Sequence, residues 1–308
     1  THFGARGDSQ IFFDYFMKFF DDIFFPYLKE NQIKTVIHAG DFMDRRKFVN
    51  FSILNQVRSR FISRLQEEGI QVHCILGNHD VYYRNTNNVN STTELFSGDM
   101  KIYEKPEVVD FDGFPIALLP WVNKENHEEA VEFIKNASAS MLVGHLELDG
   151  YQVMRGINHH GGMDAKLFTR YEKVLSGHFH CRQEKDNIYY MGTQYQITFA
   201  DMNEVKGFHV LDTETRTLLS PVAAFTKYAK VFVDHKEHPY TFGRFTDKLY
   251  DAGIAKITIV EEVTDAEWTK EEIVDLAQDT VTLINNEIDS MEEVKDKDKM
   301  KTLIKELY

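Results

Sequence analysis

The chain has 308 residues, of which 43% are hydrophobic and 27% charged, so it is long enough for one large or two ordinary folded domains. Its most apolar stretch, residues 11–28, is interrupted by charged residues and a proline, which argues against a membrane-spanning helix. Two cysteines are too few for a disulfide framework, so we expect a cytoplasmic chain without a secretory leader. The net charge of −14 argues against a general nucleic-acid coat protein, which carries a basic face, but it does not exclude a polyanionic substrate at a local metal site.

The first 227 residues alternate between helix-like and strand-like segments, which predicts a layered α/β domain. In the first long segment, aromatic and aliphatic residues recur at helical spacing, which predicts one apolar face toward a core. The expected helices cover residues 10–29, 51–68 and 125–135. The expected strands cover residues 35–38, 71–76, 108–110, 114–119, 140–143, 172–175, 188–191 and 207–211, with a hairpin turn at Asp112-Gly113.

The pattern changes near Tyr228. Two strand-like segments around a helix-like one predict a small α+β domain over residues 228–262. From residue 263 the pattern is helical, with an apolar stripe that includes Trp268 and Ile288 and a charged run after it. An apolar stripe needs a surface that covers it, so we expect residues 263–308 to form a helical, charged segment that docks a partner. Packing of the stripe on the chain's own domain is the alternative.

Four expected strands end in the same way: an apolar strand stops, a glycine follows, and side chains able to bind metal come next. The four endings are Gly40-Asp41, Gly77-Asn78-His79-Asp80, Gly144-His145 and Gly177-His178-Phe179-His180. In open α/β sheets, ligands bind where strands deliver their carboxyl ends, and glycine lets the backbone turn sharply there. Each ending alone is typical of an ordinary turn, but four in one chain predict a metal site.

The endings supply imidazoles, carboxylates and one amide, a set that suits Mn²⁺, Fe²⁺ or Zn²⁺ better than Ca²⁺ or a structural zinc ion. The series resembles the calcineurin-like metallophosphoesterase superfamily, and within it the SbcD-type double-strand-break repair nucleases, especially their T-even-like bacteriophage branch. Further residues similar to that branch are Ser91-Thr92-Thr93-Glu94-Leu95 and Leu119-Pro120-Trp121. The resemblance implies a layered metallophosphoesterase β-sandwich flanked by helices, over residues 1–227. A small α+β capping domain and a C-terminal helical segment would follow.

The resemblance also implies two divalent metal ions, most readily Mn²⁺, with Mg²⁺, Fe²⁺ or Zn²⁺ as alternatives. Asp41 would bridge the two ions. The remaining ligands would be His2 and His180 for the first ion, and Asn78, His145 and His178 for the second. The family pattern opens with an Asp-x-His motif, whereas this sequence begins Thr1-His2. We therefore expect a chain clipped inside that motif, without its aspartate and its first strand.

Residues beside these ligands are candidates for catalysis and substrate binding. The resemblance implies that His79 binds no metal and instead protonates the leaving oxygen or stabilises the pentavalent phosphate, which suits an imidazole because it transfers protons near neutral pH. We expect Asp44 to orient His79 through a ring N–H, with a solvated carboxylate as the alternative. Arg45, Arg46 and Lys47 form a basic cluster that we expect to contact flanking phosphates, with a solvated loop as the alternative.

The implied function is that of a two-metal DNA nuclease subunit in a recombination and double-strand-break repair complex, with 3′→5′ exonuclease action on duplex ends and endonuclease action on single strands. The resemblance implies a homodimer formed through helices such as residues 51–68, an SbcC-type ABC/SMC-like ATPase partner, and action in the cytoplasm of a phage-infected bacterium. Two alternatives stay open. Gly40-Asp41-Phe42-Met43-Asp44-Arg45 is also similar to a phosphoprotein phosphatase motif, which favours a phosphomonoesterase. The other alternative is a catalytically inactive scaffold with the same fold.

Overall fold

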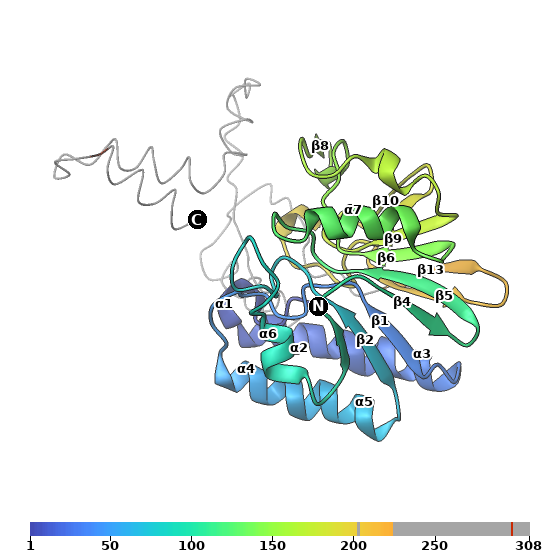
Figure 1. Cartoon of the computed structure of the whole chain (residues 1–308). Helices are drawn as coiled ribbons and strands as arrows, with labels where there is room; N and C mark the ends of the chain where they lie inside the picture. The colour runs from blue at the N-terminus through green and yellow to red at the C-terminus, as the bar shows by residue number, and fades with distance from the viewer. Residues whose placement is uncertain (202–203, 224–296, 298–308) are drawn as a thin grey trace, which may run out of the picture. The chain divides into compact units, whose positions relative to one another are not determined.

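Two β-sheets lie face to face in the computed structural model, and helices cover the outer side of each sheet (Figure 1). The structure describes residues 1–201, 204–223 and 297. All of these except Lys297 belong to one of the two units into which the chain divides. None of the described helices is long and apolar enough to cross a bilayer.

Two long helical segments form the outer layer on one side. The first consists of α2 (Gln10–Phe19), a π-helical stretch η1 (Phe20–Phe24) and α3 (Phe25–Glu30), after a short α1 (Ala5–Asp8). The second consists of α4 (Phe51–Gln56), π-helical η2 (Val57–Ile62) and α5 (Ser63–Glu67). Asn50 begins the second segment, because its side chain accepts the backbone N–H groups of Ser52 and Ile53. Both helices confirm the sequence prediction.

The first sheet is parallel, with strand order β1-β2-β3. Its strands are β1 (Thr35–His38), β2 (Gln71–Ile75) and β3 (Lys101–Tyr103), with α6 (Ser91–Phe96) in the connection between the last two. Aromatic side chains of the helical layer pack on this sheet and form its largest core cluster, with Phe16, Phe20 and Phe61 among its buried members. Burial of these rings supplies much of the apolar driving force for this half of the fold.

The second sheet has six strands in the order β10-β11-β9-β6-β5-β4. These are β4 (Glu107–Phe111), β5 (Phe114–Leu119), β6 (Met141–Gly144), β9 (Lys173–Ser176), β10 (Gln183–Lys185) and β11 (Ile188–Tyr190). The four inner strands are parallel, and β4 and β10 pair antiparallel at the two edges. Helix α7 (His127–Asn136) and the 3₁₀ turn η3 (Ala165–Phe168) bury Ile134 and Phe168 on its outer face.

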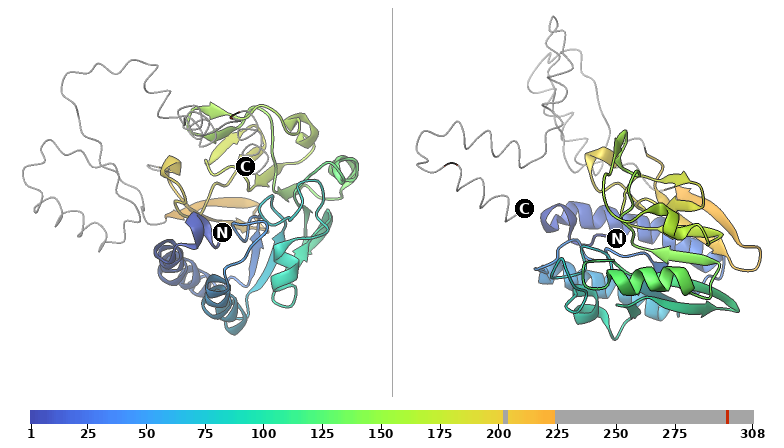
Figure 2. Two further views of the ribbon diagram at one scale, coloured as in Figure 1. Left: turned by 90° about the vertical axis from the view of Figure 1, so that its left-hand side faces the viewer. Right: turned by 45° about the horizontal axis from the view of Figure 1, so that its top comes forward.

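A second apolar layer joins the two sheets. Ile75 of the first sheet is buried in one cluster with Leu118, Val143 and Leu175 of the second. The order helix, sheet, sheet, helix is visible from two further directions in Figure 2. This arrangement confirms the predicted α/β class and the layered sandwich flanked by helices.

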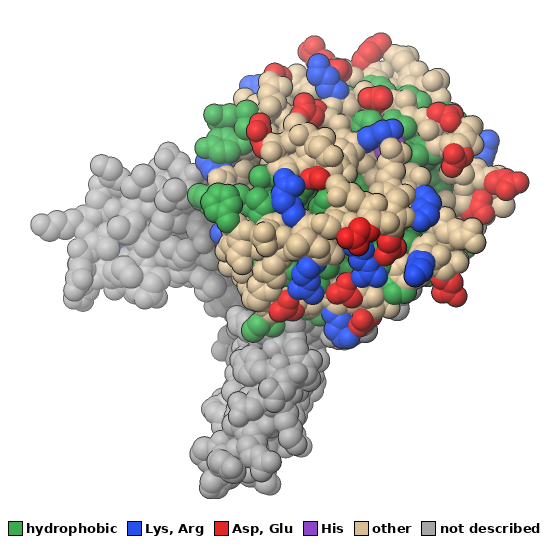
Figure 3. All heavy atoms as spheres, turned by 90° about the horizontal axis from the view of Figure 1, so that it is seen from below, with side chains coloured by type: hydrophobic (Ala, Val, Ile, Leu, Met, Phe, Trp, Pro, Cys, Tyr) green, Lys and Arg blue, Asp and Glu red, His purple; other side chains and the backbone are tan. Residues whose placement is uncertain are grey.

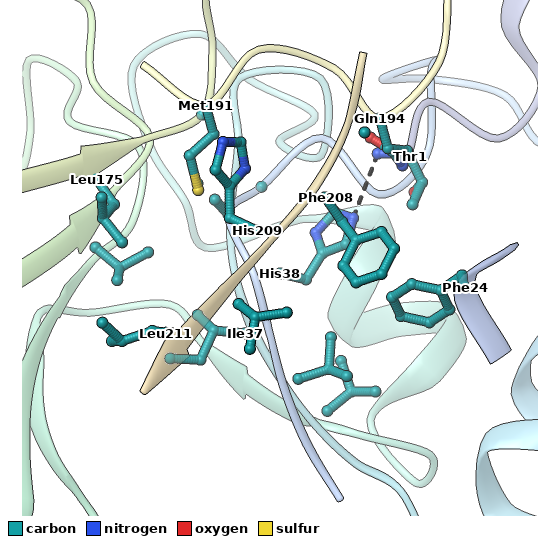
Figure 4. Close-up of a pocket in the computed structure, with 18 of the residues that line it drawn as sticks. Thr1, Phe24, Ile37, His38, Leu175, Met191, Gln194, Phe208, His209 and Leu211 are labelled. Atoms are coloured by element: carbon teal, nitrogen blue, oxygen red, sulfur yellow. Dashed lines mark hydrogen bonds between the residues drawn. The ribbon is translucent and has the colours of Figure 1, made fainter. Parts of the chain in front are cut away.

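A hairpin lies beside the first sheet and borders an apolar cavity of about 540 Å³ (Figure 4). The hairpin is β12 (Gly207–Asp212) and β13 (Thr217–Ala223). Phe208 and Leu211 of β12 line the cavity together with Phe24, Ile37 and Met191. Among the described strands β1 pairs only with β2, so the other backbone edge of β1 borders this cavity. The remaining elements are the hairpin of β7 (Gln152–Met154) and β8 (Ile157–Asn158) and the turn η4 (Phe199–Asp201).

The other sequence predictions divide into confirmed and untested ones. The β4–β5 hairpin turns at Asp112-Gly113, and both residues have positive φ as such a turn requires. The strands predicted after it and the helix at 125–135 are confirmed within two residues at their ends. The domain at residues 228–262 lies outside the described residues, as does the segment 263–308 except Lys297, so both stay predictions. The strand expected before Thr1 also stays a prediction.

Candidate metal centre

Loops that follow four strands meet at one end of the two sheets. β1 and β2, parallel neighbours in the first sheet, lead into the loops of Asp41 and Asn78. β6 and β9, parallel neighbours in the second sheet, lead into His145 and His178. The contacts described below bring all six sequence-predicted ligands together.

Two glycines allow the loops of the first sheet to approach this closely. Gly40 has φ +87°, which favours glycine, and a Cβ there would overlap Nδ1 of His145. A Cβ on Gly77 would overlap the Asp41 carboxylate. These glycines of the sequence motifs therefore make room for the ligands that they precede or face.

Three of the predicted ligands hold a left-handed backbone conformation. The φ angles are 52° for His2, 57° for Asp41 and 75° for His178. Such conformations cost about 1–3 kcal/mol each in residues other than glycine and persist where the surrounding structure imposes them, often at functional sites. The left-handed backbone at these three residues is thus a second indication, beside the clustered side chains, of a functional site.

One group of ligand atoms gathers around His2. His2 Nε2 lies 3.5 Å from Asp41 Oδ2 and 3.2 Å from His180 Nε2. His2, Asp41 and His79 each place one ligand atom within 4.8 Å of the others. His79 thus lies among the candidate ligands, although the family resemblance implies that it binds no metal, and that role stays a prediction.

A second group shares Asp41 with the first. His145 Nε2 lies 3.3 Å from Asp41 Oδ2, and the ligand atoms of Asp41, His145 and His178 all lie within 4.8 Å of one another. Asn78 Oδ1 completes this group, at 3.0 Å from His145 Nε2 and 2.9 Å from His178 Nδ1.

The two groups fit a pair of divalent metal ions. Their donors are imidazole nitrogens, one carboxylate and one amide oxygen, which suit transition-metal ions. Asp41 belongs to both groups, because its Oδ2 faces both His2 and His145, while its Oδ1 accepts the backbone N–H of His79. His2 and His180 would complete the first ion's ligands, and Asn78, His145 and His178 those of the second.

Residues 2–182 match the family model described as calcineurin-like phosphoesterase. This stretch contains both groups of ligands. The chain belongs to the calcineurin-like phosphoesterase family.

Two curated relatives of this chain are nuclease components by name. Exonuclease subunit 1 of Enterobacteria phage T4 is 41% identical over 191 residues, which cover 61% of this chain and 56% of the relative. The SbcD component of the nuclease SbcCD from Staphylococcus epidermidis is 30% identical over 100 residues, 30% of this chain and 27% of the relative. The chain therefore spans about half, or less, of the length of these relatives. A solved archaeal phosphodiesterase matches with a TM-score of 0.30 and 13% identity, over 63% of this chain and 86% of that one.

Outward-facing ring nitrogens fix how the histidines of the site are oriented. His145 Nδ1 donates to the backbone oxygen of Ala39 at 2.7 Å, which leaves the lone pair of Nε2 toward Asp41. His2 Nδ1 lies 3.1 Å from Asp44 Oδ1. Bonds of this kind orient metal-binding histidines and raise their basicity.

Asp44 does not contact His79 in the way that the sequence predicts. Its carboxylate contacts His2, whereas its backbone oxygen accepts the Nδ1–H of His79 at 2.6 Å. Asp44 therefore lies beside the His79 ring, but the atom in contact with the ring is its backbone oxygen, and the orienting role stays a prediction. The Asp44 carboxylate contacts His2 instead of His79, because the His2 ring lies between Asp44 and Asp41.

Burial and mutual charge set the protonation of the site. Burial raises the pKa of Asp41, but His145, then His2 and His79, outweigh it and hold that pKa well below its usual range. Burial lowers the pKa of His180 to about 3, and it lowers that of His178 well below the ordinary value. These two rings are therefore neutral, which is the form that binds metal. Burial acts in the same direction on His145, but the Asp41 carboxylate outweighs it and raises the pKa of His145.

Basic and aromatic residues form the rim of the site. Lys47 Nζ lies 5.4 Å from the ring centre of Tyr82, whose ring is 4.7 Å from that of exposed Tyr83. Burial and the neighbouring charge of Arg84 lower the pKa of Arg46, while Asp41 acts in the opposite direction. Arg46 is thus close to both the rim and the centre.

The third member of the predicted basic cluster is engaged elsewhere. Arg45 forms an ion pair of 3.0 Å with Asp8, whose side chain is largely buried. Arg45 therefore supports the loop, and Arg46 and Lys47 are the two cluster members beside the rim.

The sequence motifs assign no role to Asp80, the last residue of Gly77-Asn78-His79-Asp80. Asp80 is fully buried, and its carboxylate accepts the backbone N–H groups of Gly77, Asp41 and Phe42 at 2.8–2.9 Å. It thereby ties the loops after β1 and β2 together. The sequence signal for such a role is that Asp80 ends a run of four turn-forming residues directly after a strand.

Proposed function

We propose that this chain is a divalent-metal-dependent DNA nuclease subunit of a recombination and double-strand-break repair complex. The observation that carries the proposal is the sharing of Asp41 by two groups of ligand atoms. The names of the two relatives, one an exonuclease subunit and the other part of a nuclease, support the assignment of DNA as the substrate. By the same resemblance, its actions are 3′→5′ exonuclease cleavage of duplex ends and endonuclease cleavage of single strands.

The chemistry follows from the residues that face the shared carboxylate. Two bound ions would polarise the phosphodiester and lower the pKa of the attacking water. The ligand atoms of Asp41, His145 and His178 already lie close together without substrate. These side chains therefore need little rearrangement during the reaction. We propose Mn²⁺ as the working metal, in keeping with the nitrogen and oxygen donors.

His79 is suited to move a proton at the leaving oxygen. Its Nδ1–H is engaged by the backbone oxygen of Asp44, so Nε2 is the nitrogen left to face a substrate. Protonated at Nε2, the ring can donate to the oxygen that leaves as the phosphodiester breaks. The backbone of His79 is itself fixed, because its N–H donates to Asp41 Oδ1 at 2.8 Å.

The rim offers contacts to a nucleic-acid strand. Arg46 and Lys47 supply positive charge for phosphates. Tyr82 and Tyr83 have exposed fractions of 37% and 52%, and such rings can stack on bases. We propose that the strand leaving the metal centre passes over these residues.

We further propose a homodimer through the helical layer. Phe48, in the loop before α4, and Phe51, the first residue of α4, are 71% and 79% exposed, and Ile11 of α2 is 51% exposed. Elsewhere this layer carries paired charges such as Arg64 with Asp21, and Figure 3 shows basic and acidic side chains intermingled on the face seen from below. Light scattering should find a dimer for the wild type and a monomer after Phe51→Glu; a wild-type monomer would contradict this part of the proposal.

The partner and the place of action extend the same resemblance. We propose an SbcC-type ATPase partner and action on DNA in the cytoplasm of a phage-infected bacterium. Pull-down with such an ATPase, using the full chain and a chain that lacks residues 263–308, tests the partner. Binding that survives the deletion would contradict the docking role of that segment.

A paired assay tests the activity. One reaction contains end-labelled duplex and single-stranded DNA, the other a generic phosphomonoester, each with Mn²⁺ or Mg²⁺. We expect Mn²⁺-dependent shortening of DNA that His79→Ala abolishes, with no turnover of the monoester. Turnover of the monoester without DNA cleavage would establish the phosphomonoesterase alternative. No activity in either reaction, in a sample that binds no metal, would establish the inactive scaffold.

A further inference from the structure

One carboxylate outside the predicted site faces two imidazoles. Glu147 Oε1 lies 3.4 Å from His159 Nε2 and 3.9 Å from Nε2 of His178. The side chains of Glu147 and His159 are 38% and 24% exposed, so both lie at the edge of the protein interior. Neither residue belongs to the sequence motifs that predicted the metal centre.

The loop that carries Glu147 packs against the segment of Gly162 and Met163. The backbone oxygen of Glu147 accepts the N–H of Met163 at 2.9 Å, and Leu148 forms a parallel bridge with the same residue. Gly162 has φ +80°, and a Cβ there would overlap the Glu147 backbone oxygen. The backbone of Glu147 is therefore fixed against the segment that also carries His159.

The position of Glu147 completes a pattern among the ligands. His145 and His2 each direct one ring nitrogen into the site and the other to an oxygen acceptor, from Ala39 and Asp44 respectively. In His178 it is Nδ1 that faces the ligand Asn78, at 2.9 Å. Its Nε2 therefore points outward, and Glu147 is the carboxylate that it faces.

His159 is the second imidazole that faces Oε1 of Glu147. Its Nε2 is buried and has no hydrogen bond within the described part of the chain, although Glu147 is 3.4 Å away. Its ring lies 5.6 Å from that of Phe179, whose own ring is 4.7 Å from His178. A buried ring nitrogen without a partner is costly, so a small rotation of Glu147 that satisfies His159 is favourable.

We propose that Glu147 is a positioning residue for the second metal ion: it accepts the Nε2–H of His178 and thereby directs the Nδ1 lone pair toward that ion. His159, which faces the same carboxylate oxygen, holds it in place. This inference rests on the metal centre of the proposed function, and it adds residues that neither the family match nor the sequence motifs assign. Residues of this kind change metal affinity about 10- to 100-fold when they are replaced.

The test measures Mn²⁺ binding without DNA, by titration calorimetry and by the electron paramagnetic resonance signal of free Mn²⁺. We expect Glu147→Ala to weaken one of two Mn²⁺ sites about 10-fold or more and to leave the other unchanged. Glu147→Gln, which keeps an acceptor oxygen, should lose much less. In the Glu147→Ala background, His159→Leu should have no further effect, since its role passes through the carboxylate.

Asp149→Asn is the matched control, because it removes one negative charge from the same loop at a residue whose side chain is 60% exposed. We expect it to leave both Mn²⁺ affinities unchanged. If folded Glu147→Ala binds Mn²⁺ with wild-type affinities, the inference is overturned but the metal centre is not. The same holds if Glu147→Ala and Asp149→Asn lose Mn²⁺ affinity equally. A wild-type protein that binds fewer than two Mn²⁺ ions would overturn the metal centre itself and the inference with it.

Discussion

The carboxylate of Asp80 accepts the backbone N–H of Asp41 at 2.8 Å. Asp80 is fully buried, and burial followed by the nearby charge of Asp41 raises its pKa. Two buried carboxylates thus lie side by side, one turned to backbone donors and the other to the histidines. The Asp80 interactions hold the Asp41 backbone in its left-handed conformation, and so the centre depends on a residue that binds no metal.

Asp80→Asn is expected to destabilise the protein by about 1–3 kcal/mol, because an amide has one oxygen for several donors and turns its NH₂ toward N–H groups. Urea unfolding of the metal-free protein measures this change. Asp110→Asn is the control, since the exposed Asp110 side chain also accepts a backbone N–H, that of Gly113, but in a surface turn. Equal unfolding free energies for the two variants would contradict a special role of Asp80.

Asp41→Asn tests the shared ligand. Asp41 belongs to both groups of ligand atoms, so we expect its replacement to lower the number of bound Mn²⁺ ions from two to at most one. Equilibrium dialysis with metal analysis gives that number. Asp44→Asn is the comparison, because it alters only the carboxylate on His2; it should keep both ions with affinity at one site reduced about 10- to 100-fold. Two tightly bound ions in Asp41→Asn would remove the bridging role.

His79→Ala tests whether His79 donates a proton or binds a metal ion. We expect the variant to bind two Mn²⁺ ions and to lose DNA cleavage about 100-fold or more, which is the usual contribution of a general acid. The measurement pairs metal analysis with single-turnover cleavage. His127→Ala, at an exposed position on α7, should change neither quantity. Loss of one ion in His79→Ala would instead make His79 a ligand, as its place in the first group allows.

Sequence patterns predicted what is local in this fold. Apolar periodicity located the helices that begin at Gln10 and Phe51, and apolar runs that end in glycine located the strands and the candidate ligands after them. They could not say that Asp44 would contact His2 through its side chain and His79 through its backbone, because that depends on how three loops pack. Glu147 was missed for the same reason: it reaches His178 from another loop, and no spacing in the sequence records that approach.

The strained backbone of His178 gives a prediction about stability alone. At φ 75° a glycine is favoured over any residue with a Cβ, so His178→Gly should be about 1 kcal/mol more stable than His178→Ala. His145, whose φ is not positive, provides the control, because there the glycine variant should be the less stable of the pair. Urea unfolding of the four metal-free variants measures both differences. An alanine variant that is at least as stable as the glycine variant at His178 would show that the left-handed conformation costs nothing there.

A buried histidine away from the centre predicts how stability depends on pH. His73 in β2 is 3% exposed and lies 2.7 Å from the Tyr103 hydroxyl through Nδ1. Burial, with a smaller effect of Lys101, lowers the pKa of His73 to about 4 from its ordinary value of 6.5. Between these two values the unfolded chain binds a proton at His73 that the folded chain does not, so the free energy of unfolding falls as the pH falls from 6.5 to 4. Above pH 6.5 both states are neutral there and this stabilisation is complete.

His73→Gln removes the titrating group and keeps a polar side chain beside Tyr103. We expect its melting temperature to fall less than that of the wild type between pH 7 and pH 4.5, in metal-free protein by calorimetry. The buried imidazoles of the metal centre also favour the neutral form, so the variant should keep part of the acid sensitivity. His127→Gln should keep all of it, because that histidine is exposed. An identical pH dependence in His73→Gln and the wild type would show that His73 titrates normally in the folded protein.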